Sequence, residues 1–319
     1  MTAALLLALL LAPVKAQPTD SSFRPPSAAT PDRETARAAG ALREGKPERA
    51  IEEARRALAI SERHVPAMLV LSRAYLALGK LELSGAILDV AVAIEPKSAE
   101  VPFVRGFIAL AEGEQTTAIG LFKRATELDG KHALAWNALG AELVLTKNYA
   151  GARAALEAAV QLSPKLAKAH MNLGCALRGL KEYDKAEAAL LRALALDATL
   201  ADALYDLGIL YLDADPFPGL ETVPRLEKAV DYLQRFRTKL GPRLPADDPA
   251  HTYVAEAQKS LDRQRKLLEK RKGKPADKAP RPAGPKPAEP KPELKPAEPK
   301  PAEPRPTDKS GALPAPARG

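Results

Sequence analysis

The sequence is poor in the residue types from which most active sites and cross-links are built. It holds one cysteine, one tryptophan and only 4% aromatic residues. Because Cys175 has no second cysteine to pair with, an internal disulfide is excluded. The four histidines are far apart, and the sequence has no HExxH motif, no Gly-rich phosphate loop and no nucleophile elbow. We therefore expect no catalysis, no cofactor, no metal and no small-molecule substrate.

Strand signals are also scarce. The sequence contains no run of alternating β-branched residues, and its apolar residues, 46% of the chain, are mainly alanine and leucine. This composition suits closely packed helices better than a sheet. We predict an all-α fold.

Long apolar runs are missing as well. Residues 3–14, AALLLALLLAPV, are fewer than the roughly 20 residues that a helix needs to span a membrane. Small residues near Ala16 favour a signal peptide at 1–16 with cleavage after Ala16, and hence export to the periplasm or cell envelope without a transmembrane helix in the mature chain. No Lys or Arg precedes the run, so an apolar amino-terminal helix stays as the alternative. A Pro- and Ser-rich linker is expected at 17–30.

The sequence does contain a strict 34-residue period. In residues 133–166, Trp136, Leu139, Gly140 and Leu143 follow the spacing i, i+3, i+4, i+7, which places them on one face of a helix. A second apolar set, at positions 152, 156 and 159, predicts a partner helix. Small residues that let paired helices approach closely recur at every step of 34: Ala38, Ser72, Gly106, Gly140, Gly174 and Gly208.

This pattern resembles the tetratricopeptide repeat family, whose signature is W-x2-L-G-x2-Y, then A-x3-F, then a closing Pro. The resemblance implies a right-handed α-solenoid of helix pairs. Six repeats would start at residues 31, 65, 99, 133, 167 and 201 and fill 31–241, with an insertion at 213–221 in the last. Val254, Ala257, Leu261 and Leu268 then form one stripe, which predicts a capping helix at 248–272.

In this family the first helix of each repeat lines a groove that holds peptides or helices of partner proteins. The resemblance therefore implies a partner-binding groove, whose residues we predict to be Leu69, Arg73, Phe103, Phe107, Asn137, Lys168, Met171, Asn172, Arg178, Asp202, Tyr205 and Ile209. Five of them are large and apolar and would form an exposed stripe, which usually indicates a partner: Phe103, Phe107, Met171, Tyr205 and Ile209. In the alternative reading, these residues pack against one another or are covered by the ends of the chain.

One family subtype clamps carboxyl-terminal peptides with cations. Here Asp202 and Asp206 stand where that clamp needs its cations, so the sequence argues against this role and favours a basic partner segment.

Residues 273–319 are rich in Pro, Lys, Glu and Ala, with near-copies of KPAEP, and are predicted to be a disordered tail. Residues 263–319 carry a net charge of +9, against +8 for the whole chain, so the repeats are close to neutral. The basic tail could contact peptidoglycan or a membrane surface. Nucleic acid is disfavoured because the tail has no aromatic residues to stack on bases.

Together these features predict a non-catalytic scaffold that binds a protein segment in its groove within a bacterial envelope complex. The alternative is a cytoplasmic assembly or regulatory module of the same family, whose amino terminus only resembles a signal peptide.

Overall fold

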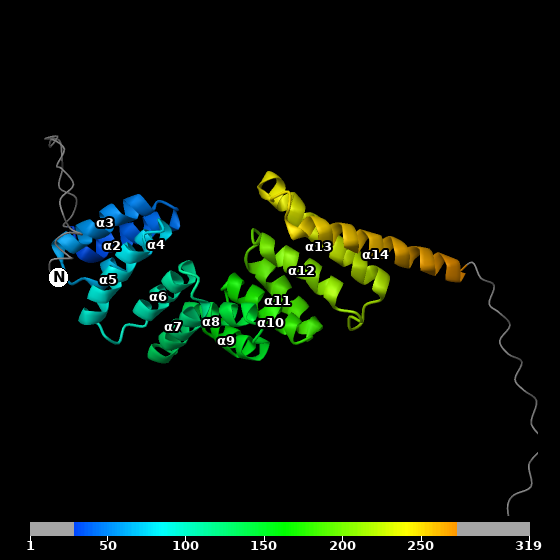
Figure 1. The fold of residues 1–319 in the computed structure, drawn as a ribbon, viewed down its shortest axis with the longest axis horizontal. Helices are drawn as coiled ribbons and strands as arrows, with labels where there is room; N and C mark the ends of the chain where they lie inside the picture. Colours follow the sequence, from blue (N-terminus) through cyan, green and yellow to red (C-terminus); the bar gives the residue numbers. More distant parts are fainter. Residues whose placement is uncertain (1–28, 273–319) are drawn as a thin grey trace, which may run out of the picture. The chain divides into compact units, whose positions relative to one another are not determined.

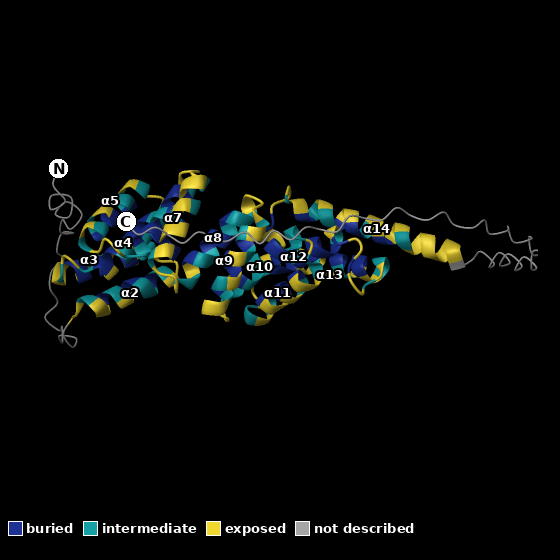
Figure 2. Ribbon diagram, turned by 90° about the horizontal axis from the view of Figure 1, so that it is seen from below, coloured by how far each residue is buried: buried dark blue, intermediate teal, exposed yellow. Residues whose placement is uncertain are grey.

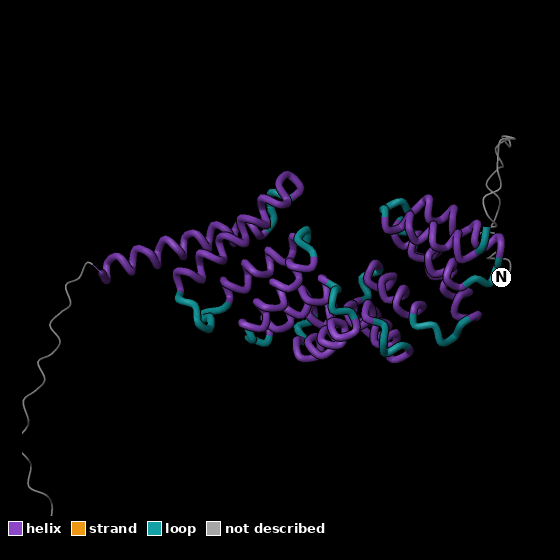
Figure 3. The backbone as a smooth tube through the Cα atoms, turned by 180° about the vertical axis from the view of Figure 1, so that it is seen from behind, coloured by secondary structure: helices purple, strands orange, loops and turns teal. Residues whose placement is uncertain are grey.

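The computed structural model describes residues 29–272, which form thirteen α-helices and one short 3-10 helix (Figure 1). The all-α prediction is confirmed, because the described residues contain no strand beyond an isolated bridge between Phe217 and Leu220 (Figure 3). The predicted signal peptide, most of the linker and the Pro-rich tail lie outside these residues. The elements are α2 (Pro31–Arg43), α3 (Pro47–Ile60), α4 (Val65–Ala77), α5 (Leu81–Ile94), α6 (Glu100–Ala111), α7 (Gln115–Leu128), α8 (Ala133–Leu145), α9 (Tyr149–Leu162), α10 (Ala167–Gly179), α11 (Tyr183–Leu196), α12 (Ala201–Asp213), α13 (Thr222–Leu240), η1 (Gly241–Arg243) and α14 (Pro249–Lys272).

The even-numbered helices α2 to α12 are the first helices of six antiparallel pairs, and α3 to α13 are the second helices. The turn after each of the first five first helices contains a residue with positive φ, at the same place in the repeat. Glycine fills it at 45, 79 and 113, where a side chain would be strained, and Lys147 and Lys181 fill it with φ of 61° and 62°. The same turn geometry therefore recurs along the array.

Within each of the last four pairs, a glycine on the first helix faces a large side chain on the second. A Cβ added at Gly140 would lie 2.4 Å from Leu156 Cγ, and one at Gly106 would lie 2.4 Å from the Phe122 ring. In the second pair two serines replace this contact: Ser72 and Ser84 are fully buried, and their hydroxyl oxygens lie 2.8 Å apart. Each hydroxyl also donates to the other's backbone carbonyl, so both polar groups are satisfied.

Successive pairs stack in chain order as an α-solenoid, because each second helix packs against the next first helix. Neighbouring first helices also touch, as in α2 with α4 and α8 with α10, whereas second helices of consecutive described pairs make no comparable contact. The first helices therefore share one face of the stack. Within the described residues, α6 and α8 are an exception: they are joined through α7 rather than by direct packing.

The last pair is closed by an inserted loop and by α14. Arg225 of α13 is buried, and its guanidinium donates to the carbonyls of Tyr211 (2.6 Å) and Leu212 (3.2 Å) at the end of α12. It also lies 3.1 Å from the Asp215 carboxylate in the loop. One side chain thus satisfies orphan carbonyls of α12 and fixes the loop.

Only the first half of helix α14 packs against the array. Val254, Ala257 and Leu261 are buried against Ile209 and Leu233. Leu268, predicted as the fourth member of this stripe, is 43% exposed because α14 continues past the residues that it covers (Figure 2). None of the described helices meets the length and hydropathy that a membrane span requires.

Candidate functional site

The predicted groove residues divide into three groups by exposure. Phe103 and Ile209 are buried, whereas Phe107, Lys168 and Asp202 are exposed. The others are half-buried: Leu69, Arg73, Asn137, Met171, Asn172, Arg178 and Tyr205.

A continuous exposed apolar stripe is therefore not what the structure shows. Ile209 packs in the cluster that α14 forms with α13, and the Tyr205 ring lies 6.2 Å from the Tyr253 ring of α14. Met171 packs against the buried cluster around Leu190. Of these three residues, Ile209 is buried by the chain's own helices, and Met171 and Tyr205 are half-buried against them.

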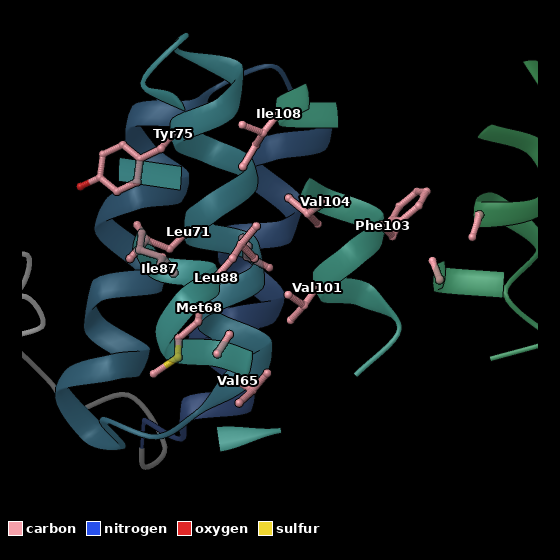
Figure 4. Close-up of a cluster of buried hydrophobic side chains, with 14 of the residues drawn as sticks. Val65, Met68, Leu71, Tyr75, Ile87, Leu88, Val101, Phe103, Val104 and Ile108 are labelled. Atoms are coloured by element: carbon pink, nitrogen blue, oxygen red, sulfur yellow. The ribbon is translucent and has the colours of Figure 1, made fainter. Parts of the chain in front are cut away.

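An aromatic cluster lies where α6, α7 and α8 meet. The Phe107 ring is 5.1 Å from both Phe103 and Phe122, and Phe103 is 4.7 Å from the His132 ring. Phe103 projects from the side of α6 opposite to Val101 and Val104, which point into the core with α4 (Figure 4). Phe103 is 7% exposed and packs edge-to-face against Phe107, which remains 39% exposed. The cluster thus presents one large apolar ring to solvent.

Leu134 of α8 is another exposed apolar residue on the first helices, and the sequence analysis missed it. It is 50% exposed in the first turn of α8. The signal was available, because Leu134 stands at the same repeat position as Lys168 and Asp202. Two residues further on, the indole N–H of Trp136 donates to the carbonyl of Gly130 at 2.9 Å, which ties the start of α8 to the preceding turn.

A charged group borders the aromatic cluster. Arg73 forms an ion pair with Glu100, and its guanidinium carbon lies 5.8 Å from the centre of the Phe103 ring. The Nε2 atom of His132 lies 3.1 Å from the Glu100 carboxylate, while its Nδ1 accepts from the N–H of Ala135. The hydrogen bond with His132, followed by the charge of Arg73, lowers the pKa of Glu100 against the opposing effect of burial. The carboxylate therefore stays ionised.

The first-helix face of α8, α10 and α12 is polar instead. The Asn172 amide donates to the side-chain oxygen of Asn137 at 3.1 Å, and Arg178 pairs with Asp213. Burial raises the pKa of Asp206 to about 6, although Cys175 and Arg178 oppose the shift. Burial likewise raises the pKa of the Cys175 thiol, so this group stays protonated and is a poor nucleophile at neutral pH.

The described residues contain no group of three His, Cys, Asp or Glu side chains that could hold a metal ion. The first helices carry the exposed apolar residues Phe107 on α6 and Leu134 on α8, and an ion pair between Arg73 of α4 and Glu100 of α6 lies beside the aromatic cluster. Such residues can bind an apolar side chain and orient it with nearby charges.

Comparisons with known proteins agree with this architecture. The tetratricopeptide repeat matches the chain in three segments, residues 41–101, 105–167 and 167–200. No curated protein matches the sequence. These segments follow each other along the chain from the end of α2 to α11, and the last pair, α12 and α13, lies beyond them.

Several solved structures share the fold. One chain of the APC/C hetero-tetramer Cut9–Hcn1 is 18% identical over 72% of this chain, with a TM-score of 0.60, and the match covers 42% of that chain, less than half its length. The pilF protein of Pseudomonas aeruginosa is 19% identical over 72% of this chain and 96% of its own, with a TM-score of 0.56. PilW, a type IV pilus biogenesis factor, is 17% identical over 70% of this chain and 98% of its own, with a TM-score of 0.55. At these identities the likeness concerns the fold alone.

Proposed function

Because the chain belongs to the tetratricopeptide repeat family, we propose that it is a non-catalytic scaffold that holds a segment of a partner protein against its first helices. The segment lies over α6 and α8, where an apolar side chain of the partner packs on Phe107 and Leu134. Arg73 and Glu100 border the same surface and orient the polar part of the segment.

The observation that carries this proposal is the exposure of Phe107 and Leu134 on neighbouring first helices. Phe107 packs in part on Phe122 of its own pair but stays 39% exposed, and Leu156 fills the space beside Gly140 without any contribution from Leu134. Exposed side chains of this size on one face are typical of protein interaction sites. Aromatic anchors of this kind tend to carry much of the binding energy of an interface.

A pull-down from the native source with purified chain tests the proposal. We expect Phe107→Ser combined with Leu134→Ser to lower recovery of the partner at least about 10-fold, as loss of one interface anchor costs 1 kcal/mol or more. The matched control is Ile60→Ser with Leu191→Ser, which removes two exposed apolar side chains from second helices. Equal recovery with both double variants, each folded by circular dichroism, would refute a site on α6 and α8.

We further propose that the scaffold works in the cell envelope, in a complex of several proteins. The support is the apolar run at residues 3–14 followed by small residues, together with the similarity in fold to PilW, a type IV pilus biogenesis factor. In this setting the Lys-rich residues 273–319 reach peptidoglycan or a membrane surface. Sequencing the mature amino terminus tests the location: Gln17 in an extracytoplasmic fraction supports export, whereas Met1 in the cytosol supports a cytoplasmic assembly module.

A further inference from the structure

The outer face of α14 carries a row of cations. Lys259, Arg263, Lys266 and Lys270 follow the spacing i, i+4, i+7, i+11, which aligns them along one side of the helix. At 1.5 Å per residue the row is about 17 Å long. All four residues are exposed. We call these four residues the cationic row.

The cationic row faces away from the array. Val254, Ala257 and Leu261, which are buried, lie on the opposite side of α14. Arg265 lies on the side that faces α13 and pairs with Glu227 at 2.7 Å. Among the residues that the structure describes, the row is thus exposed along its length, while the other side of the same helix anchors it to the array.

Neighbouring acids do not neutralise the row. Among the described residues, none of its four cations forms an ion pair. The acids on the same part of α14, Glu256, Asp262 and Glu269, lie to either side of it, and Asp262 accepts a hydrogen bond from Gln258 at 3.0 Å. Leu267 lies beside the row and is 46% exposed.

We propose that the cationic row docks α14 on an anionic lipid bilayer. A straight row on one helix fits a flat surface of negative charge better than a shaped partner, because within residues 29–272 only side chains of α14 itself line this face. Lys and Arg clusters on a helix, beside an apolar side chain, bind anionic lipid head groups. Leu267 enters the head-group layer next to the cations. Nucleic acid fits less well, since the row contains no aromatic or amide side chain that would stack on or read a base.

Vesicle co-sedimentation with the full chain tests the proposal. Each cation near an anionic surface contributes about fivefold to binding. We expect wild type to bind vesicles of phosphatidylcholine and phosphatidylserine and not phosphatidylcholine alone. A variant with Lys259, Arg263, Lys266 and Lys270 changed to Gln should lose at least about 100-fold in affinity for the mixed vesicles. Higher salt should weaken the wild-type binding as well.

The matched control changes four exposed cations of other elements, Lys123, Lys131, Lys165 and Arg192, to Gln, which alters the net charge equally. It should retain binding within about fivefold. A loss as large as that of the row variant would mean that net charge alone acts, and full binding by the row variant would mean that the row does not dock; either result overturns the proposal. The proposal would also be overturned, in favour of nucleic acid, if the wild type bound duplex DNA more tightly than the mixed vesicles and the row variant lost that binding. Phe107→Ser should leave vesicle binding unchanged, which separates this site from the proposed protein-binding face.

Discussion

At the scale of single residues, the glycine on each first helix from α6 to α12 permits close contact with one large side chain. Gly140 and Gly120 make opposite predictions. Gly140→Ala places a methyl group 2.4 Å from Leu156 Cγ, so we expect a loss of about 1–3 kcal/mol in the free energy of unfolding from overpacking. Gly120→Ala lies in the interior of α7 with nothing within 4 Å, so we expect a gain of about 0.5–1 kcal/mol from helix propensity. Urea unfolding measures both, and the same sign for both would contradict the packing described here.

The buried carboxyl of Asp206 predicts a pH effect on stability. Its pKa of about 6 in the fold lies above the usual value near 4, because burial disfavours the charged form. The folded state therefore binds the proton more tightly than the unfolded state. The contribution of this group is complete below about pH 4 and is lost as the pH rises through 6, by about 3 kcal/mol.

Asp206→Asn removes this dependence, because the amide stays neutral at every pH. We expect the variant to be more stable than wild type at pH 8 and not at pH 4, in urea titrations at both pH values. The exposed Asp184 is the control residue, since Asp184→Asn should leave the shape of the stability profile unchanged. A parallel shift of the whole profile in Asp206→Asn would argue against titration of this carboxyl.

At the scale of elements, Arg225 determines how the last helix pair closes. Lys at this position keeps the charge but cannot reach two carbonyls and a carboxylate together. We therefore expect Arg225→Lys to lower the free energy of unfolding by about 2–3 kcal/mol, because buried carbonyls lose their donors. Arg235→Lys is the matched control, as its exposed ion pair with Asp231 should contribute less than about 1 kcal/mol. Thermal or urea unfolding separates the two.

The helices were predictable because their signal is local. Apolar residues three and four apart and small residues at a fixed period define helix pairs without reference to distant contacts, as Gly140 and Leu156 illustrate. The role of Arg225 was not predictable in this way. Its partners lie 13 and 14 residues away across an irregular loop, and a charged side chain in a helix normally indicates an exposed face.

At the scale of the whole molecule, the described array behaves as a one-dimensional stack in which each pair depends mainly on its neighbours. Leu261→Asp places a charge between α14 and α13, where Leu261 is 3% exposed. We expect amide hydrogen exchange to accelerate in α12, α13 and α14 and to remain slow in α4 to α7. Leu268→Asp, on the exposed turn of α14, is the control and should leave exchange unchanged. Uniform acceleration along the array would show that it unfolds as one cooperative unit.

The candidate site was only partly predictable from the sequence, because the exposure of its residues depends on contacts between helix pairs. Repeat positions identify which side chains point toward the first-helix face, but their exposure depends on what neighbouring helices cover. Tyr205 and Ile209 satisfy the positional rule and are covered by α14. Phe107 stays accessible, because α6 and α8 are joined through α7 instead of packing directly on each other. That junction depends on how successive pairs stack, which repeat spacing alone does not specify.

The position of Trp136 gives this junction a built-in optical probe. It is the chain's one tryptophan, and its indole N–H is bonded to the carbonyl of Gly130 in the turn before α8, two residues along the chain from the exposed Leu134. Tryptophan emission therefore comes from a single place, the start of the helix on which a bound segment would lie. A blue shift on titration would report removal of water there, so occupancy can be followed in the unlabelled natural chain.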